Sequence, residues 1–181
     1  MIKPVGSLGR LESLPPRWAA LQGTDRPQAR PAAAILFAAD HPVVQRGVSA
    51  YPAAVTAAIV RSLHAGQAAA AVLARSTGTP LHVVDVGVNT ASFTPTASGI
   101  TATRAEVASD REGDVTVADA MSRRTYARAF AAGVQAVDAL AADVRTVVLG
   151  EVGIGNTTLA ACIAAKYTGM APDRAVGRGA G

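Results

Sequence analysis

Three short apolar runs recur along the chain, and each is closed by glycines or polar residues. They are AAILFAA at 33–39, LHVVDVGV at 81–88 and RTVVLGEVG at 145–153. A continuous apolar run of this length is typical of a strand that is buried on both faces, as in a parallel sheet. We therefore predict a strand over each run.

Helical spacing fills the intervals between these runs. Apolar residues fall on one face of a helix predicted from Ala53 to Arg75, and Pro52 suits its first turn. We expect a second helix over 117–142, a third directly after Thr157, and a short one over 17–22. Strands that alternate with helices predict an α/β fold: a doubly wound, Rossmann-like, mostly parallel sheet with flanking helices.

The remaining segments are expected to lack regular structure. The stretch 89–114 is polar and contains glycine, so we predict a loop there. Residues 1–31 are rich in proline and are assigned to an N-terminal loop and short-helix segment. Residues 32–181 then form the α/β core, and the apolar strands lead us to expect an open sheet edge and open helix faces.

Composition excludes several classes of protein. Half of the residues are hydrophobic but only 4% are aromatic, so the core must be built from aliphatic side chains. The net charge is +4 and the basic residues are scattered, with Arg123-Arg124 as the one adjacent pair, so no nucleic-acid partner is expected. No signal peptide or run of ~18 apolar residues is recognised, which favours a cytoplasmic protein without a membrane partner. Cys162 lies in an apolar helical stretch and is predicted to be buried.

The richest chemistry lies in GEVGIGNTT, residues 150–158, directly after the third predicted strand. Backbone N–H groups at a glycine turn and a helix N-terminus make an anion site, and Asn156, Thr157 and Thr158 are able to cap the helix or bind a phosphate. The pattern alone leaves open an ordinary strand-to-helix turn with a helix cap. Polar residues also follow the first strand (Asp40-His41) and lie in the second (85–87).

The same stretch excludes two common nucleotide motifs. It mimics the spacing of a P-loop, but Asn156 stands where a lysine must reach the β- and γ-phosphates. No G-x-G-x-x-G follows any strand, which disfavours a dinucleotide oxidoreductase. Glu151 is the informative residue, because a carboxylate beside a phosphate site should meet something basic or proton-bearing. His64 and His82 are expected to be structural, and no spacing of histidines and acids indicates a metal site.

Five stretches in order resemble one known family. KPVGSLGRLE (3–12), FAADHPVVQRGVSAYPAAVT (37–56), VVDVGV (83–88), GEVGIGNTT (150–158) and GRGAG (177–181) resemble nicotinate-nucleotide–dimethylbenzimidazole phosphoribosyltransferase. The resemblance covers nearly the whole chain. It implies transfer of 5-phosphoribosyl from nicotinate mononucleotide to 5,6-dimethylbenzimidazole, giving α-ribazole 5′-phosphate and nicotinate, in cobalamin biosynthesis. It also implies a homodimer, small-molecule substrates and no cofactor or metal.

The resemblance assigns the site residues position by position. Glu151 matches an acid of the active site and is the one catalytic candidate. The substrate-binding candidates are Tyr51, Ala58, Val152, Gly153, Gly155, Asn156, Thr157, Thr158, Gly177, Arg178 and Gly179. Within this set, the stretch 51–58 matches one wall of the benzimidazole pocket, and 177–179 matches a second glycine-rich segment near the phosphate.

Some positions depart from the family pattern. Val152 replaces the usual methionine or leucine, Pro42 replaces a glycine, and Pro15-Pro16 interrupts a stretch that is normally helical. Ala58 stands where a glutamine that faces the base is common, which puts base selectivity in doubt. Family members run to about twice this length, and their general-base glutamate lies in the second half. We therefore expect an N-terminal part that is weakly active or inactive alone, or alternatively a non-catalytic module that binds the nucleotide or the benzimidazole.

Overall fold

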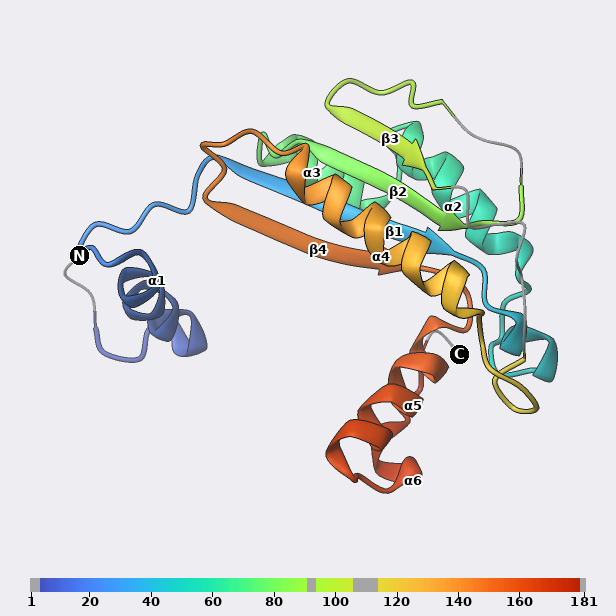
Figure 1. The fold of residues 1–181 in the computed structure, drawn as a ribbon. Helices are drawn as coiled ribbons and strands as arrows, with labels where there is room; N and C mark the ends of the chain where they lie inside the picture. The colour runs from blue at the N-terminus through green and yellow to red at the C-terminus, as the bar shows by residue number, and fades with distance from the viewer. Residues whose placement is uncertain (1–3, 91–93, 106–113, 180–181) are drawn as a thin grey trace.

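The protein, described here from a computed structural model over residues 4–90, 94–105 and 114–179, is built on a parallel sheet of four strands (Figure 1). The strands are β1 (Ala32–Ala39), β2 (Leu81–Gly87), β3 (Ile100–Arg104) and β4 (Thr146–Val152), in the spatial order β3-β2-β1-β4. Each neighbouring pair is parallel. This confirms the predicted α/β class and the three strands predicted from apolar runs.

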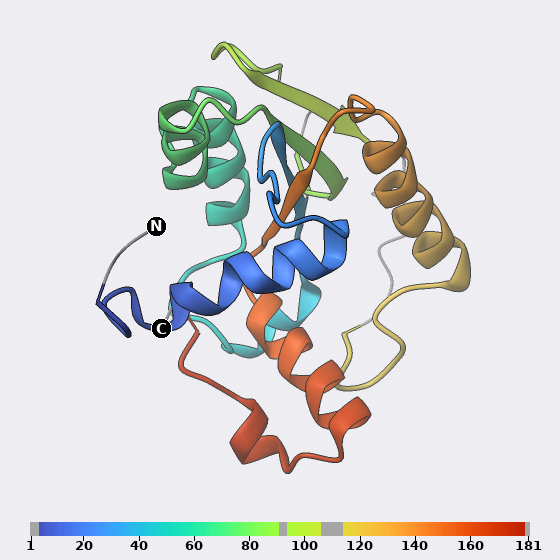
Figure 2. The same cartoon turned by 90° about the vertical axis from the view of Figure 1, so that its left-hand side faces the viewer.

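Helices cover both faces of the sheet, as a doubly wound fold requires (Figure 2). α2 (Ala54–His64) and α3 (Ala69–Ser76) lie on one face, and α4 (Arg123–Asp138) lies on the other. The chain then passes through β4 into α5 (Asn156–Thr168) and the short α6 (Pro172–Ala175). The remaining elements are η1 (Gly9–Ser13), α1 (Leu14–Gln22) and η2 (Pro42–Arg46).

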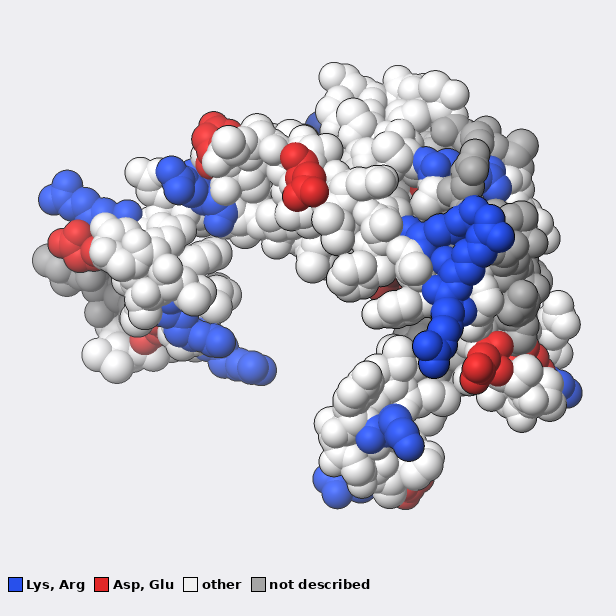
Figure 3. All heavy atoms as spheres, viewed as in Figure 1, with Lys and Arg blue, Asp and Glu red and all other residues white. Residues whose placement is uncertain are grey.

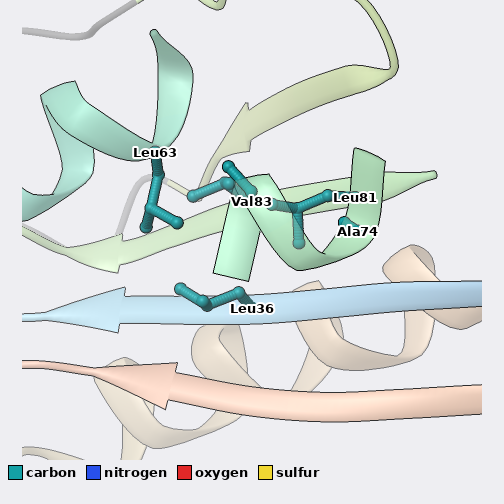
Figure 4. Close-up of a cluster of buried hydrophobic side chains, with 6 residues drawn as sticks. Leu36, Leu63, Ala74, Leu81 and Val83 are labelled. Carbon is teal, nitrogen blue, oxygen red and sulfur yellow. The ribbon is translucent and has the colours of Figure 1, made fainter. Parts of the chain in front are cut away.

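The core consists of two aliphatic layers separated by the sheet. On the α2–α3 face, Leu36 of β1 packs with Leu63, Ala74, Leu81 and Val83 (Figure 4). On the α4 face, a second cluster joins the sheet to the helix; it consists of Ile35, Val84, Ala132 and Ala136. Leu36 and Ile35 are adjacent in β1 and point to opposite faces, which explains why the strand sequences are apolar without alternation.

Two predicted boundaries were wrong on the β2 side of the sheet. The predicted loop 89–114 contains β3, whose sequence ITATR alternates in burial and so lacks the apolar run of a fully covered strand. The predicted helix 53–75 is two helices, because Gly66 takes a left-handed φ of 72° and ends the first one. A Cβ added to Gly66 would lie 3.0 Å from Arg75 Nη1, and the Arg75 guanidinium donates to the Gly66 carbonyl at 3.0 Å.

The α2–α3 stretch is also long and apolar enough to cross a membrane by length and composition, although it contains no uninterrupted apolar run of ~18 residues. The stretch Ala54–Ser76 has a mean hydropathy of 1.2. In the structure the two helices break at Gly66 and pack Leu63 and Ala71 against the sheet. They therefore have the position of core helices.

Three further expectations need correction. The helix predicted over 117–142 begins later, because the Ser122 hydroxyl accepts a hydrogen bond from Thr125 N at 3.1 Å and caps the first turn of α4. Pro15-Pro16 does not interrupt a helix but opens α1, where proline's missing N–H is tolerated. Cys162, predicted to be buried, is exposed on α5, whose buried residue is Ala161.

Candidate functional site

The candidate site lies at the point where the order of strands in the sheet reverses. The chain runs from β1 to β2 on one side and later returns to β4 on the other, so the carboxyl ends of β1 and β4 border a topological switch point, the usual ligand position in open α/β sheets. Phe37 pairs with Glu151 and Ala38 with Val152 in register. The residues after these pairs, His41 from β1 and the turn Gly153–Gly155 from β4, therefore meet.

Close packing explains the two glycines of this turn. A Cβ on Gly153 would lie 2.1 Å from the Ala39 carbonyl oxygen and 2.8 Å from His41 Nε2, so no other residue fits without a backbone shift. Gly155 has a left-handed φ of 89°, and a Cβ there would lie 3.4 Å from Val43 Cγ1. The turn thus rests directly on β1 and η2.

Glu151 is held by the amide of Asn156. Asn156 Nδ2 donates to both carboxylate oxygens, at 2.7 Å and 2.6 Å, so the acid is bonded to an amide five residues further along the chain. The helix cap differs from expectation, because Gly155 occupies the N-cap of α5 without a side-chain bond. Asn156 lies one residue inside the helix, and its Oδ1 accepts from Thr157 N at 2.8 Å.

A pocket of 310 Å³ opens beside this turn, near the lower end of the ~300–1,000 Å³ that ligand pockets span. It is lined by Val48, Ser49, Ile154, Gly155, Asn156, Thr157, Thr158, Val176, Gly177, Arg178 and Gly179. The chain after α6 returns to the start of α5, because a Cβ on Gly179 would lie 2.9 Å from Thr157 Oγ1. The two glycine-rich segments singled out in the sequence therefore line one pocket together.

The other predicted site residues do not line this pocket. Tyr51 is half exposed, and its N–H donates to the Ser49 hydroxyl at 3.2 Å. Ala58 lies on the exposed side of α2. Val152 is partly buried against the cluster of Ala38, Val60 and Val88, so its smaller side chain serves packing at the end of β4.

Two residues of this site were not assigned from the sequence. His41 contacts the turn, and burial lowers the pKa of its imidazole, although the Glu151 and Asp40 carboxylates oppose that shift. Thr56 of α2 accepts a hydrogen bond from Ile154 N at 3.0 Å. The Asp-His dipeptide after the first strand was a signal for His41, whereas nothing near Thr56 in the sequence points to Ile154.

Polar bonds also hold the ends of β1 and β2 together. Asp40 Oδ2 accepts from Asn89 N at 2.6 Å. Asp85 Oδ1 accepts from Gly87 N and Val88 N at 3.0 Å and 2.8 Å. Arg104 donates to the Thr90 carbonyl at 2.7 Å and lies 3.6 Å from Asp85 Oδ2. These bonds hold the carboxyl ends of β1, β2 and β3 to one another beside the site.

Charge is unevenly distributed on the face shown in Figure 3. Basic side chains form a band over the first half of α4, which carries Arg123, Arg124 and Arg128. The other charges on this face are more separate, and much of the surface is uncharged. The sequence-based expectation of scattered charge therefore misses this band.

Comparison with known proteins supplies independent information. A family model described as phosphoribosyltransferase matches residues 1–181. The nicotinate-nucleotide–dimethylbenzimidazole phosphoribosyltransferase of Bradyrhizobium sp. (strain BTAi1) is 45% identical over 185 residues, covering 100% of this chain and 50% of the relative. The protein of the same name from Chromobacterium violaceum is 43% identical over 184 residues, covering 100% and 51%.

A solved structure agrees with these matches. The crystal structure of CobT from Thermus thermophilus has a TM-score of 0.77 and 35% sequence identity to this chain, and the match covers 100% of this chain and 53% of that one. The chain spans about half the length of the curated relatives it matches.

Proposed function

The chain belongs to the nicotinate-nucleotide–dimethylbenzimidazole phosphoribosyltransferase family, and on this premise we propose that it binds nicotinate mononucleotide at the turn Gly153–Thr158. We further propose that it serves transfer of the 5-phosphoribosyl group to 5,6-dimethylbenzimidazole, which forms α-ribazole 5′-phosphate and releases nicotinate. The observation that carries this proposal is the pocket between the turn and Gly177–Gly179, at the switch point of the sheet.

The pocket suits a monophosphate better than a triphosphate. Its walls offer backbone N–H groups, the hydroxyls of Ser49, Thr157 and Thr158, and the guanidinium of Arg178. A single phosphate is satisfied by such donors at a helix N-terminus. The lysine that a P-loop supplies is replaced by Asn156, whose amide is already bonded to Glu151.

The reaction needs a base as well as a phosphate site. A nitrogen of the benzimidazole attacks C1′ of the ribose, the bond from C1′ to the nicotinate nitrogen breaks, and its electron pair neutralises the pyridinium. The attacking azole then carries an extra proton, which a carboxylate must accept. We assign this role to Glu151, because its carboxylate is bonded to and oriented by the amide of Asn156, a residue of the pocket lining.

A second candidate function is binding of the nucleotide or the benzimidazole without turnover. The specific observation in its favour is that both oxygens of Glu151 accept hydrogen bonds from Asn156. A carboxylate engaged in this way must release a bond before it accepts a proton. In that case Glu151 organises the turn and does not act as the base.

Calorimetric titration and a product assay on Glu151→Gln separate the two candidates. We expect the wild type to bind nicotinate mononucleotide more tightly than nicotinate or NADH, because the pocket recognises the phosphate. Glu151→Gln should bind the nucleotide almost as well. If the wild type forms α-ribazole 5′-phosphate on a chromatographic assay, the substitution should lower kcat by about 10²–10⁴-fold, the range for a positioned base.

Other results would argue against these roles. Tighter binding of NADH than of nicotinate mononucleotide would overturn the proposed ligand. Loss of nucleotide binding in Glu151→Gln, with unchanged turnover per bound complex, would overturn the proposed base. Binding without product in the wild type would support the second candidate for this 181-residue chain.

A further inference from the structure

One buried hydroxyl joins α2 to the middle of the nucleotide-binding turn. Thr56 lies in the first turn of α2 and is 0% exposed, and its Oγ1 accepts the Ile154 N–H at 3.0 Å across 98 residues of sequence. Ile154 is itself buried between Gly153 and Gly155. The bond therefore satisfies a backbone donor that water does not reach.

The neighbouring contacts make Thr56 the polar part of a larger support. Gly153 rests on the Ala39 carbonyl and the ring of His41, and Gly155 rests on Val43. On the α2 side, Ala57 and Val60 lie in the same apolar cluster as Val152. Ile154, the middle residue of the turn, is held by a hydrogen bond to a side chain of α2.

We propose that Thr56 is a positioning residue for the nucleotide site, an inference that rests on the proposed function. Its hydroxyl fixes the Ile154 peptide and, one residue later, the left-handed Gly155 from which α5 starts. The N–H groups proposed to meet the phosphate follow directly, so their direction depends on this bond. Thr56 itself is not one of the residues that line the pocket, and it reaches the pocket through Ile154, which does.

The position of Thr56 also connects the two proposed substrate walls. α2 begins just after Tyr51, in the segment proposed to wall the benzimidazole pocket, and Thr56 ties that helix to the phosphate turn. A shift of α2 on binding of the base would therefore be passed to the turn. The inference predicts that Thr56 contributes to nucleotide affinity and to coupling between the two substrates.

Two substitutions at Thr56 separate the hydrogen bond from packing. Thr56→Val keeps the branched shape but removes the acceptor, so the buried Ile154 N–H loses its partner. Thr56→Ser keeps the hydroxyl and removes a methyl group. We expect Thr56→Val to raise the Kd for nicotinate mononucleotide about tenfold, as loss of a buried hydrogen bond implies, with little effect on nicotinate. Thr56→Ser should bind the nucleotide within about twofold of the wild type if it retains that bond.

A matched control distinguishes positioning from general destabilisation. Val84→Ala in β2 removes buried side-chain volume from the core on the α4 face, away from the turn. At a temperature where every variant is folded, it should leave nucleotide affinity unchanged. Equal losses in Thr56→Val and Val84→Ala, or an equal loss in Thr56→Ser and Thr56→Val, would overturn the inference.

Amide hydrogen exchange tests the inference without any ligand. Thr56→Val should speed exchange at Ile154, Gly155 and the first turn of α5, and Thr56→Ser should not. Unchanged exchange, or a change confined to Ile154, would overturn the positioning role even if the protein binds the nucleotide. Failure of the wild type to bind nicotinate mononucleotide would overturn the proposed function, and the exchange result would still decide the role of Thr56.

Discussion

β2 and β4 flank the central strand β1 on its two sides and carry similar apolar runs, but their surroundings differ. Val84 of β2 is 1% exposed, whereas Val148 and Leu149 of β4 are 54% and 67% exposed. β2 has β3 beyond it, α2 and α3 on one face and α4 on the other. Within the described residues, no strand pairs with the outer side of β4.

The difference shows that an apolar run identifies a strand suited to burial on both faces, whether or not this chain covers those faces. Register with β1 places Val148 beside Ala34 on the α3 face and Leu149 beside Ile35 on the α4 face. Neither helix layer covers these two side chains, so β4 has the composition of an inner strand in the position of an edge strand. This confirms the expected open sheet edge. The candidate site lies on the border between the covered and the open side.

The strongest test of the comparison is a leucine-to-alanine substitution made once on the covered side of the sheet and once on the open side. Leu63→Ala on the covered side should lower the free energy of unfolding by about 2–5 kcal/mol, because it removes packed methyl groups and leaves a cavity. Leu149→Ala should cost less than about 1 kcal/mol, since most of that side chain is already in water. Urea denaturation followed by circular dichroism measures both. Similar losses for the two variants would mean that β4 is covered in solution.

A second test concerns the border itself. Gly153→Ala forces a Cβ against the Ala39 carbonyl, so we expect a loss of about 1–3 kcal/mol, as for other overpacked sites, together with weaker binding of nicotinate mononucleotide. Gly133→Ala in α4 is the matched control. Its Cβ would lie 3.9 Å from Phe37 Cζ, an ordinary contact, and alanine should stabilise the helix by up to about 1 kcal/mol. Thermal melts of both variants should therefore shift in opposite directions, and a stable Gly153→Ala would show that the turn has room to move.

Sequence patterns predicted the covered strands better than the exposed one. β1, β2 and β4 were found because long apolar runs identify strands meant for burial on both faces. β3 was missed because one polar side of ITATR faces solvent, and the signal was its β-branched alternation. The exposed Cys162 shows the opposite error, since an apolar helix was assumed to be a covered one.

The candidate site was predicted as far as its motifs are local. Gly155 through Thr158 and Gly177 through Gly179 do come together in the lining of one pocket, although their roles stay predictions. Thr56 was not assigned, because no spacing in the sequence reveals its contact with a turn far along the chain. His41 was signalled by its place after the first strand, but its contact with Gly153 was not. Thr56 and His41 are about 100 residues away from the turn in the sequence, and only the fold brings them into contact with it.

A third test uses the three histidines, which lie on the covered side and at the border. Burial lowers the pKa of His41, His64 and His82 below 6.5. The unfolded chain therefore binds more protons than the folded one just below pH 6.5, and stability should fall as the pH drops from 7.5 to 5.5. Asp114, whose pKa is lowered to about 2 mainly by hydrogen bonds from Thr116, contributes nothing in this window.

Urea midpoints measured across that pH range check the sign. His82→Asn should flatten the pH dependence, since its ring is one of those that protonate more readily in the unfolded chain. A midpoint that rises as the pH falls would show that neighbouring carboxylates, and not burial, dominate these imidazoles.

The smallest change in folding free energy is expected at the open edge, where the change in association should be clear. Leu149→Lys places a charge on β4, and charged edges resist strand-to-strand pairing. Because Leu149 is mostly exposed, stability should stay within about 0.5 kcal/mol. We expect the wild type to self-associate in sedimentation velocity as its concentration rises, and Leu149→Lys to keep a lower sedimentation coefficient.

Leu21→Lys in α1 replaces another exposed leucine and is the control. If it reduces association as much as Leu149→Lys does, the contact is not specific to the open edge. A wild type that stays monomeric at all concentrations would show that an uncovered β4 is tolerated in water without a partner.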